Sequence, residues 1–474
     1  MNTTWIRQGA VALSLLLLAS AAAATDGMNL EGYGPIAHGM GGAAIAFDNG
    51  SAALMNNPAT LGLLPDGEAR LDLALGSLGP SVAVAMEAMD LSADSDATAF
   101  WMPALGYYRR GGALTYGLGV FGQGGMGTEY ASKTFMAGPT GEDVLSQVSV
   151  GRAMLPVAYA LNEKLTLAAT LDFVWGGMDL KMPFVVGDAA APSGPAPGSF
   201  MDFMGSHVLG EADVSAGFGQ AIEGMMTGGM LAADDYARIE FADDSDFTGA
   251  AKGTGFAGKL GFVYQATPDF AVGATYHLKT ALSDWEADEA VMAFYEGDGS
   301  GLIGEAIPGS MAVEDFQWPA VLGLGVAFSP AERWVLAADY KLIQWADTMA
   351  DFKMTFTAEG GDLDGESVGI TFYQEWEDQS VINLGAAFRA SELLVLRGGA
   401  VIASNPIPDE FVNPLFPAIE ENHFTGGLGL NFAERQALNL SFAVAPEVEQ
   451  ENSNTTLAVT HSQFNFQVMY SLGF

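Results

Sequence analysis

The final segment of the chain, residues 461–474, alternates between apolar and mostly polar side chains. It reads HSQFNFQVMYSLGF, with an apolar residue at every even position from 464 to 474. Successive side chains of a β-strand point to opposite faces, so the segment predicts a strand with one wholly apolar face. An edge strand of a soluble sandwich can show this alternation, but the strands of a transmembrane barrel require it, with aromatic residues at the membrane interfaces. The segment therefore favours a transmembrane β-barrel.

The first residues, 1–24, have the features of a secretory signal peptide. Arg7 supplies the positive charge, residues 11–19 form an apolar core, and the small residues 22–24 provide a cleavage site. This apolar run is too short for a good membrane anchor, and no later segment offers the roughly 20 apolar residues that a membrane-spanning helix needs. We therefore expect an exported protein that crosses a membrane only with strands.

The composition excludes several classes of protein. The chain has no cysteine, which rules out disulfides and thiol chemistry. A formal net charge of −39 argues against nucleic acid as a partner, because phosphates are bound by Lys and Arg. A hydrophobic content of 49% with only 16% charged residues is high for so acidic a soluble protein, and it fits a surface that faces lipid.

Residues 25–66 differ from everything that follows. They are rich in Gly, Ala and Asn and show no sustained alternation, which predicts a compact, turn-rich segment with one short helix near residues 50–55. The segment is too small to bury a core of its own. We therefore expect it to occupy a cavity inside the remaining domain, residues 67–474.

Residues 67–474 alternate repeatedly, and their connections have two lengths. Long segments separate the short polar turns, and the longest of them, residues 179–252, is expected to be irregular. Six short turns join twelve strands, and one strand at 68–78 and the terminal strand bring the predicted total to fourteen antiparallel strands. Short turns inside and long loops outside are the rule for outer-membrane barrels. The short turns lie at 109–112, 162–164, 267–269, 329–333, 390–392 and 433–436.

Two motifs of the N-terminal segment resemble a known family. The stretch GMGGA at 39–43 and the NPA motif Asn57, Pro58 and Ala59 resemble the hatch of the FadL/TodX outer-membrane transporters of hydrophobic compounds. The segments 153–176, 318–347 and 393–409 look like barrel strands of the same family. The resemblance covers nearly the whole mature chain apart from 179–252. It implies a barrel plugged by the hatch 25–66. Independently of the family, the terminal Phe474 resembles the signal by which bacterial outer-membrane barrels are recognised for assembly.

The resemblance also implies a function, which is passive uptake of long-chain fatty acids or hydrocarbons across the outer membrane. The ligand would enter through an extracellular groove and a barrel pocket and leave sideways at a strand kink. The Gly-rich strand at 111–125 is the expected place of this kink, since Gly marks bulges. Large apolar residues in the loops at 121–147 and 179–252 are candidate ligand contacts, although the same residues could simply pack the loops onto the barrel rim. They are Phe121, Met126, Phe135, Phe200, Phe203, Met204, Met225 and Met226.

Few cations are expected in the barrel lumen. Strand parity places them on the polar face, where they could pair with the carboxylate of a ligand. The alternative is a structural ion pair with a lumen acid such as Asp172 or Asp339. The predicted lumen cations are Arg152, Lys259, Lys279, Lys341 and Arg397.

Catalysis and cofactor binding have little support in the sequence. The five histidines lack the i, i+4 spacing of a zinc protease, and there is no nucleophile elbow and no phosphate-binding loop. The acidic runs 243–246 and 362–366 could attract calcium, but neither completes a calcium-binding loop, and solvated acid is the better interpretation. We therefore expect no enzyme activity, no cofactor and no metal site.

Two other kinds of barrel are alternatives. A structural or adhesive barrel would have no need of a hatch, and a general porin would be blocked by one. The expected protein is thus a monomeric outer-membrane channel. Its partners would be a hydrophobic small molecule, membrane lipid and the barrel assembly machinery, without nucleic acid.

Overall fold

A computed structural model describes residues 26–186, 213–243, 245 and 248–474. The predicted signal peptide and the candidate residues Phe200, Phe203 and Met204 lie outside the described residues. None of the helices in the described part of the chain is long and apolar enough to cross a membrane.

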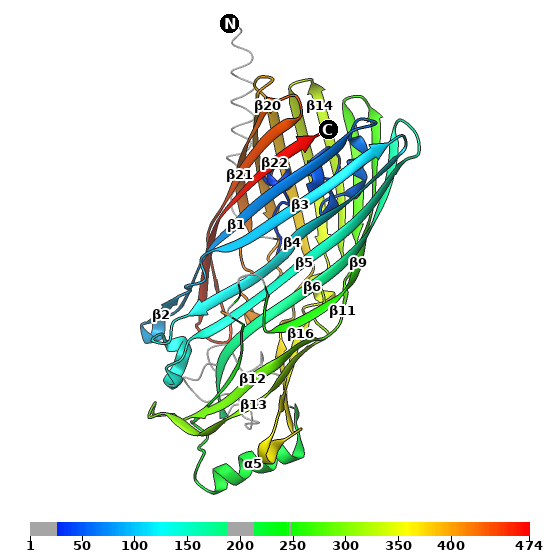
Figure 1. Cartoon of the computed structure of the whole chain (residues 1–474). Coiled ribbons are helices and arrows are strands. Elements are labelled where there is room, and N and C mark those ends of the chain that lie inside the picture. Colours follow the sequence, from blue (N-terminus) through cyan, green and yellow to red (C-terminus); the bar gives the residue numbers. More distant parts are fainter. Residues whose placement is uncertain (1–25, 187–212, 244, 246–247) are drawn as a thin grey trace.

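The strands form a closed antiparallel ring (Figure 1). Each member pairs with the next, and the last pairs with the first, from Arg70 opposite Gly473 to Ala85 opposite Ala458. The ring runs through β1 (Ala69–Met86), β3 (Phe100–Gly111), β4 (Leu114–Tyr130), β5 (Val144–Ala160), β6 (Leu165–Val185), β9 (Ala251–Thr267), β10 (Phe270–His277), β14 (Val321–Ala331), β15 (Trp334–Ile343), β18 (Gln379–Arg389), β19 (Leu394–Ala403), β20 (Asn422–Ala433), β21 (Gln436–Glu451) and β22 (Ala458–Gly473).

The terminal strand has the two faces that its sequence predicts. Phe464 and Phe466 are exposed on the outside of the ring, whereas Asn465, Gln467 and Met469 on the opposite face of the strand are buried. Phe474 is half exposed and stacks on Tyr107, with ring centroids 6.1 Å apart. The outer surface is thus apolar, as contact with lipid requires.

The prediction of fourteen strands is too low, because the sheet contains 22 strands in the described part of the chain. The long connections pair with one another and with extended ring strands, because they carry short alternating stretches of their own. These additional strands are β2 (Leu91–Asp94), β7 (Asp213–Val214), β8 (Tyr236–Phe241), β11 (Ala281–Leu282), β12 (Trp285–Tyr295), β13 (Leu302–Glu314), β16 (Asp351–Ala358) and β17 (Ser367–Tyr373).

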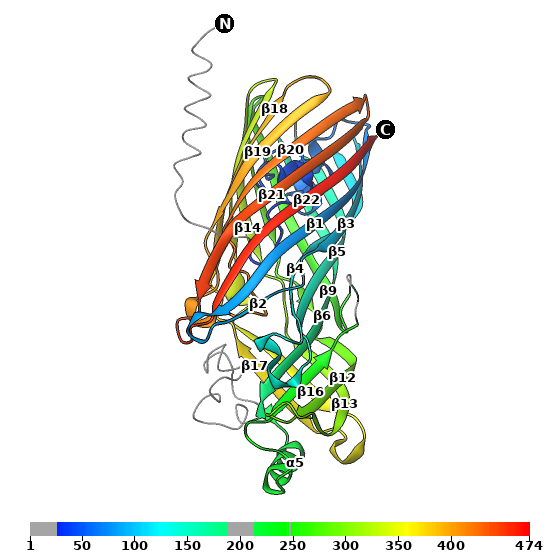
Figure 2. The ribbon, with the colours of Figure 1, turned by 90° about the vertical axis from the view of Figure 1, so that its left-hand side faces the viewer.

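The expectation that residues 179–252 are irregular is wrong in its described part. Strand β6 continues to Val185, β8 pairs with both β6 and β12, and helix α5 (Ala216–Thr227) lies between them in sequence. Figures 1 and 2 show α5 at the end of the molecule opposite the C-terminus. Short helices complete the structure at η3 (Glu87–Met89), η4 (Phe135–Thr140), η5 (Trp345–Asp347), η6 (Gly361–Leu363) and η7 (Asp409–Phe411).

Residues 26–66 lie inside the ring (Figure 2). They contain α2 (Pro35–His38), η1 (Gly50–Leu54) and η2 (Pro58–Leu63). Their hydrogen bonds reach strands all round the wall: Asp72 of β1 accepts from Ser51 N, Asp339 of β15 accepts from Ala44 N, and Thr425 of β20 accepts from Gly41 N. Buried side chains of the segment pack with side chains of the wall, such as Tyr108 and Met154.

Candidate functional site

The wall of the ring is interrupted between β3 and β4. The pairing of these strands ends at Leu105 opposite Val120. Beyond that point β3 pairs with β1 alone, while β4 continues to Tyr130 paired with β5, apart from single bridges to Asn29 and Ser95. The register between β4 and β5 shifts between Gly122 and Gly124, so the predicted irregularity of the Gly-rich strand is present.

An apolar cavity of about 310 Å³, which we call the wall cavity, lies at this interruption. Two of the predicted ligand residues, Phe121 and Met126, line it. Sequence reasoning missed the other aromatic residues, although the aromatic pair before Pro103 was a possible signal. The cavity is lined mainly by Leu78, Phe100, Trp101, Met102, Phe121, Met126, Val148, Val150 and Trp175.

The N-terminal segment pairs with the inner side of β4 at the register shift. Asn29 bridges Gly124, and Gly125 N donates to Met28 O at 3.1 Å. A Cβ atom at Gly124 would lie 2.0 Å from Met28 O, so only glycine permits this approach. Asn29 Oδ1 also accepts from Gln123 Nε2 and from Trp318 Nε1, both at 2.8 Å. The segment and the kinked strand are therefore held together.

A second apolar cavity, the outer cavity, lies beneath α5 and has a volume of about 490 Å³. The predicted residue Met226 lines this cavity. Met225 packs against the hydrophobic core to which the lining residues Phe218 and Phe294 belong. Glu366 holds α5 in place, because its Oε2 accepts from Ser215 Oγ and from the amides at the start of the helix. The other lining residues include Phe184, Val186, Phe218, Ile222, Met292 and Phe294.

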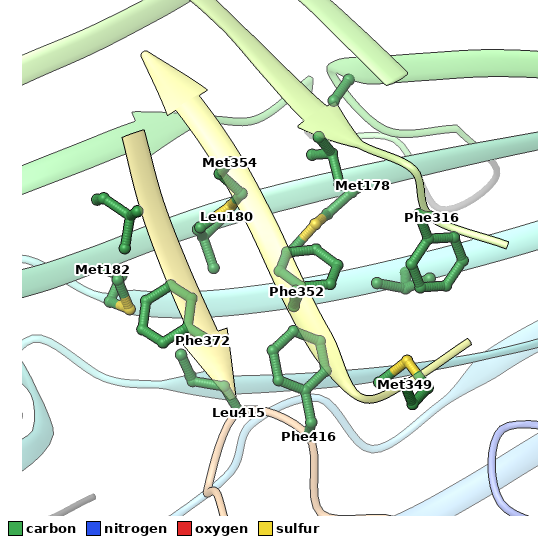
Figure 3. Close-up of a cluster of buried hydrophobic side chains, with 14 of the residues drawn as sticks. Met178, Leu180, Met182, Phe316, Met349, Phe352, Met354, Phe372, Leu415 and Phe416 are labelled. Atoms are coloured by element: carbon green, nitrogen blue, oxygen red, sulfur yellow. The ribbon is translucent and has the colours of Figure 1, made fainter. Parts of the chain in front are cut away.

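The extended loop strands enclose a buried apolar core. Figure 3 shows side chains from β6, β16, β17 and the 415–416 segment pointing toward one another. Aromatic rings continue this core, with centroids 4.6 Å apart between Trp285 and Phe316 and 5.8 Å apart between Trp318 and Trp345. Phe135 packs against the same core. Phe135 therefore has a packing role, which the sequence analysis gave as the alternative to ligand contact.

The predicted lumen cations are largely paired with carboxylates. Arg152 Nη1 lies 3.1 Å and Lys259 Nζ 2.5 Å from the same oxygen of Asp172. Lys341 Nζ lies 3.0 Å from Asp26 Oδ2. All three contacts are ion pairs within the protein, which is the alternative to binding of a ligand carboxylate.

Two of the predicted lumen cations differ from the rest. Arg397 forms no ion pair with any described residue, and Lys279 is exposed rather than in the lumen. Among the described residues, no group of three or more His, Asp or Glu side chains is arranged to hold a metal ion.

The NPA motif joins two parts of the inner segment to the wall. Asn57 Nδ2 donates to Ile45 O at 2.7 Å and to Phe262 O of β9 at 3.0 Å, while its Oδ1 accepts from Ala59 N at 3.1 Å. Pro58 begins η2, where its missing amide hydrogen costs nothing. The turn is thus fixed by side-chain as well as backbone bonds.

Replacing Asn57 by Ala is expected to loosen the inner segment while the ring still folds. The change removes the side-chain donor to the carbonyls of Ile45 and Phe262, and about 1 kcal/mol of lost stabilisation corresponds to roughly a fivefold shift in population. Leak of a small polar solute into cells with matched amounts of folded protein should rise accordingly. The control is Asn431→Ala, at an exposed position near the end of β20. An unchanged leak would show that the turn is only a spacer.

Comparisons with known proteins agree with this architecture. The model of the family described as outer membrane protein transport protein (OMPP1/FadL/TodX) matches residues 15–471. The chain is similar to the Pseudomonas putida toluene transporter TodX, with 28% identity, 94% of this chain and 99% of that chain covered, and a TM-score of 0.77. The chain is also similar to the Ralstonia pickettii toluene transporter TbuX. The two are 25% identical, 94% of this chain and 99% of that chain are covered, and the TM-score is 0.72.

One curated protein also matches the chain, over a short segment only. It is an uncharacterized protein from the phosphoenolpyruvate carboxykinase gene 5′ region of Chlorobium limicola, 44% identical over 89 residues. These are 19% of this chain and 43% of that protein. The family model, which spans nearly the whole chain, decides the classification. The chain belongs to the outer membrane protein transport protein family (OMPP1/FadL/TodX), and the predicted outer-membrane channel for hydrophobic molecules is confirmed at that level.

Proposed function

We propose that the chain is a passive channel for uncharged hydrophobic molecules, which leave the lumen sideways into the membrane between β3 and β4. The observation that carries this proposal is the apolar wall cavity at the place where the two strands stop pairing. In this proposal the strands of the closed ring span the membrane, and the other strands and α5 lie outside the cell. Residues 26–66 act as the hatch that prevents a continuous water-filled pore.

The outer cavity is proposed as the first binding place. Its lining is almost entirely apolar, and the Met side chains around it adapt to ligands of different shape. From there a ligand would pass the aromatic core to the wall cavity, where Phe121 and Met126 contact it. Ligand pockets of this size and apolar character are typical for small hydrophobic molecules.

The lumen charges support an uncharged ligand over a fatty acid. Asp172 already pairs with Arg152 and Lys259, and Asp26 with Lys341, so a ligand carboxylate would have to displace a buried protein carboxylate. Among the predicted lumen cations that are not exposed, only Arg397 has no ion pair with a described residue, and it lines neither cavity. The toluene transporters TodX and TbuX, which the chain resembles, are named for a hydrocarbon of this uncharged kind.

This preference predicts a difference between toluene and benzoate, which have similar shapes. Cells that carry the protein should take up toluene at least about tenfold faster than matched cells without it, because an apolar path replaces a polar outer leaflet. Benzoate uptake should stay at the level of the cells without protein. Radiolabelled uptake measures both rates. Equal stimulation of the two would contradict the proposed preference.

A further inference from the structure

A smaller cavity of about 60 Å³ adjoins the wall cavity, and we call it the polar cavity. The two cavities share Leu78, Phe100, Gly125 and Met126 as lining residues. The polar cavity is apolar on the side of these shared residues. Glu420 and His461 also line the polar cavity, so a molecule that reaches into it from the wall cavity can meet a carboxyl and an imidazole.

His461 presents a hydrogen-bond acceptor to this cavity. Its Nδ1 lies 2.9 Å from the carbonyl oxygen of Pro417, which can only accept, so Nδ1 carries the hydrogen. In the neutral imidazole the other nitrogen, Nε2, is then an acceptor. Nε2 lies 3.4 Å from Oε1 of Glu420 and has no hydrogen-bond partner among the described residues.

Glu420 adds further acceptor capacity. Its side chain is fully buried, and within the described part of the chain neither carboxyl oxygen has a hydrogen-bond partner. Burial raises the pKa of Glu420 well above its usual range, and the neighbouring Glu31 raises it further. A protonated Glu420 can donate its one hydrogen to His461 Nε2, but its second oxygen remains an acceptor. One acceptor is therefore left without a donor in either protonation state.

The other polar groups of the cavity already have partners. Glu31 Oε1 lies 2.6 Å from His38 Nε2 and accepts from Asn465 Nδ2 at 2.9 Å. Gln463 Nε2 donates to Asn465 Oδ1 at 2.8 Å. The unmet acceptors are thus confined to Glu420 and His461, and a buried polar group without a partner is costly.

We propose that the polar cavity binds a hydrogen-bond-donating head group, a hydroxyl or an amino group, of a ligand whose apolar body lies in the wall cavity. The ligand class is uncharged apolar molecules with one donor group, such as phenols, anilines or alcohols. A volume of about 60 Å³ holds a head group of this size, since one water molecule needs about 10–15 Å³ by the same measure. The proposal rests on the proposed function and narrows its ligand class.

The test compares three ligands of nearly equal shape, p-xylene, p-cresol and p-toluidine, which differ in a methyl, a hydroxyl and an amino group. Binding to the purified full-length protein is measured by calorimetry, with the ratio of Kd values as the readout. In the wild type, p-cresol or p-toluidine should bind about tenfold more tightly than p-xylene, because the donor satisfies a buried acceptor. Preference for p-cresol alone identifies the hydroxyl, and preference for p-toluidine alone the amino group.

The variant Glu420→Met has a side chain of similar length and no strong acceptor. It should bring the three Kd values to within about twofold of one another and leave that of p-xylene unchanged. The milder Glu420→Gln keeps a carbonyl acceptor and should retain part of the preference if Glu420→Met fails to fold. The control Glu421→Gln changes a neighbouring acid that does not line the cavity, and it should bind all three ligands as the wild type does.

Two results would overturn the proposal: equal binding of the three ligands by the wild type, or a preference that persists in Glu420→Met. Neither would affect the proposed function, which is tested by p-xylene uptake into cells. Loss of p-xylene uptake together with an intact p-cresol preference would instead contradict the channel and leave a binding site.

Discussion

A disulfide across the wall cavity is expected to stop release of hydrophobic molecules into the membrane. A Cβ atom on Gly122 of β4 would lie 3.7 Å from Met102 Cβ of β3, within the range of about 3.5–4.5 Å that disulfides require. The chain has no cysteine, so the double variant Met102→Cys, Gly122→Cys can form only this bridge. Oxidation joins the two strands where they stop pairing.

Uptake of toluene by the oxidised variant should fall by roughly an order of magnitude, because the bridge occupies the apolar passage. A reducing agent should restore it. The matched control is Met102→Cys, Gly76→Cys, since the Cβ at Gly76 would also lie 3.7 Å from Met102 Cβ but belongs to β1, which already pairs with β3 there. The control bridge should leave uptake unchanged. Equal uptake before and after oxidation of the first variant would show that the molecules leave elsewhere.

The ring strands could be predicted from the sequence because each has two different environments. Lipid outside and a packed lumen inside impose a period of two, and the predicted terminal strand 461–474 agrees closely with β22 (Ala458–Gly473). The short turns between them were recognisable for the same reason, since they interrupt a clear alternation.

The extended loops could not be predicted in this way. Met178, Leu180 and Met182 are buried on the part of β6 that continues beyond the alternating stretch, and they face other loop strands rather than lipid. The partners of such strands are far apart in sequence, as with β12 and β8, so no local pattern specifies them. Helix α5 depends on Glu366, more than 100 residues away, for its N-terminal hydrogen bonds.

The candidate site was predicted in part. Strand parity places Arg152 and Lys259 in the lumen together with Asp172, and all three meet there. Parity gives the face of a residue but not its neighbour across the ring, so it could not decide between a ligand and a structural pair. Glu420 and His461 escaped notice because Glu420 precedes its strand and belongs to no alternating segment. Their contact spans β21, which lies between β20 and the strand β22 that carries His461, and a local pattern does not reveal such a contact.

Replacing Asp172 by Asn is expected to destabilise the barrel strongly, and more than Glu420→Gln or Glu421→Gln. The carboxylate is fully buried and serves two buried cations at once, which would then repel each other without compensation. Breaking a buried ion pair by removing one partner costs about 3–5 kcal/mol. The temperature at which the folded barrel loses its heat-modifiable mobility should therefore drop clearly.

Two comparisons separate this effect from a general loss of charge. Asp351→Asn removes one partner of the exposed pair with Lys353 and should change stability by less than about 1 kcal/mol. The double variant Asp172→Asn, Lys259→Met removes a cation together with the acid and should recover part of the loss. The folded fraction of the single variant Asp172→Asn should also stimulate benzoate uptake, because Arg152 and Lys259 become available to a ligand carboxylate. Unchanged stability together with unchanged exclusion of benzoate would show that Asp172 does not neutralise these cations.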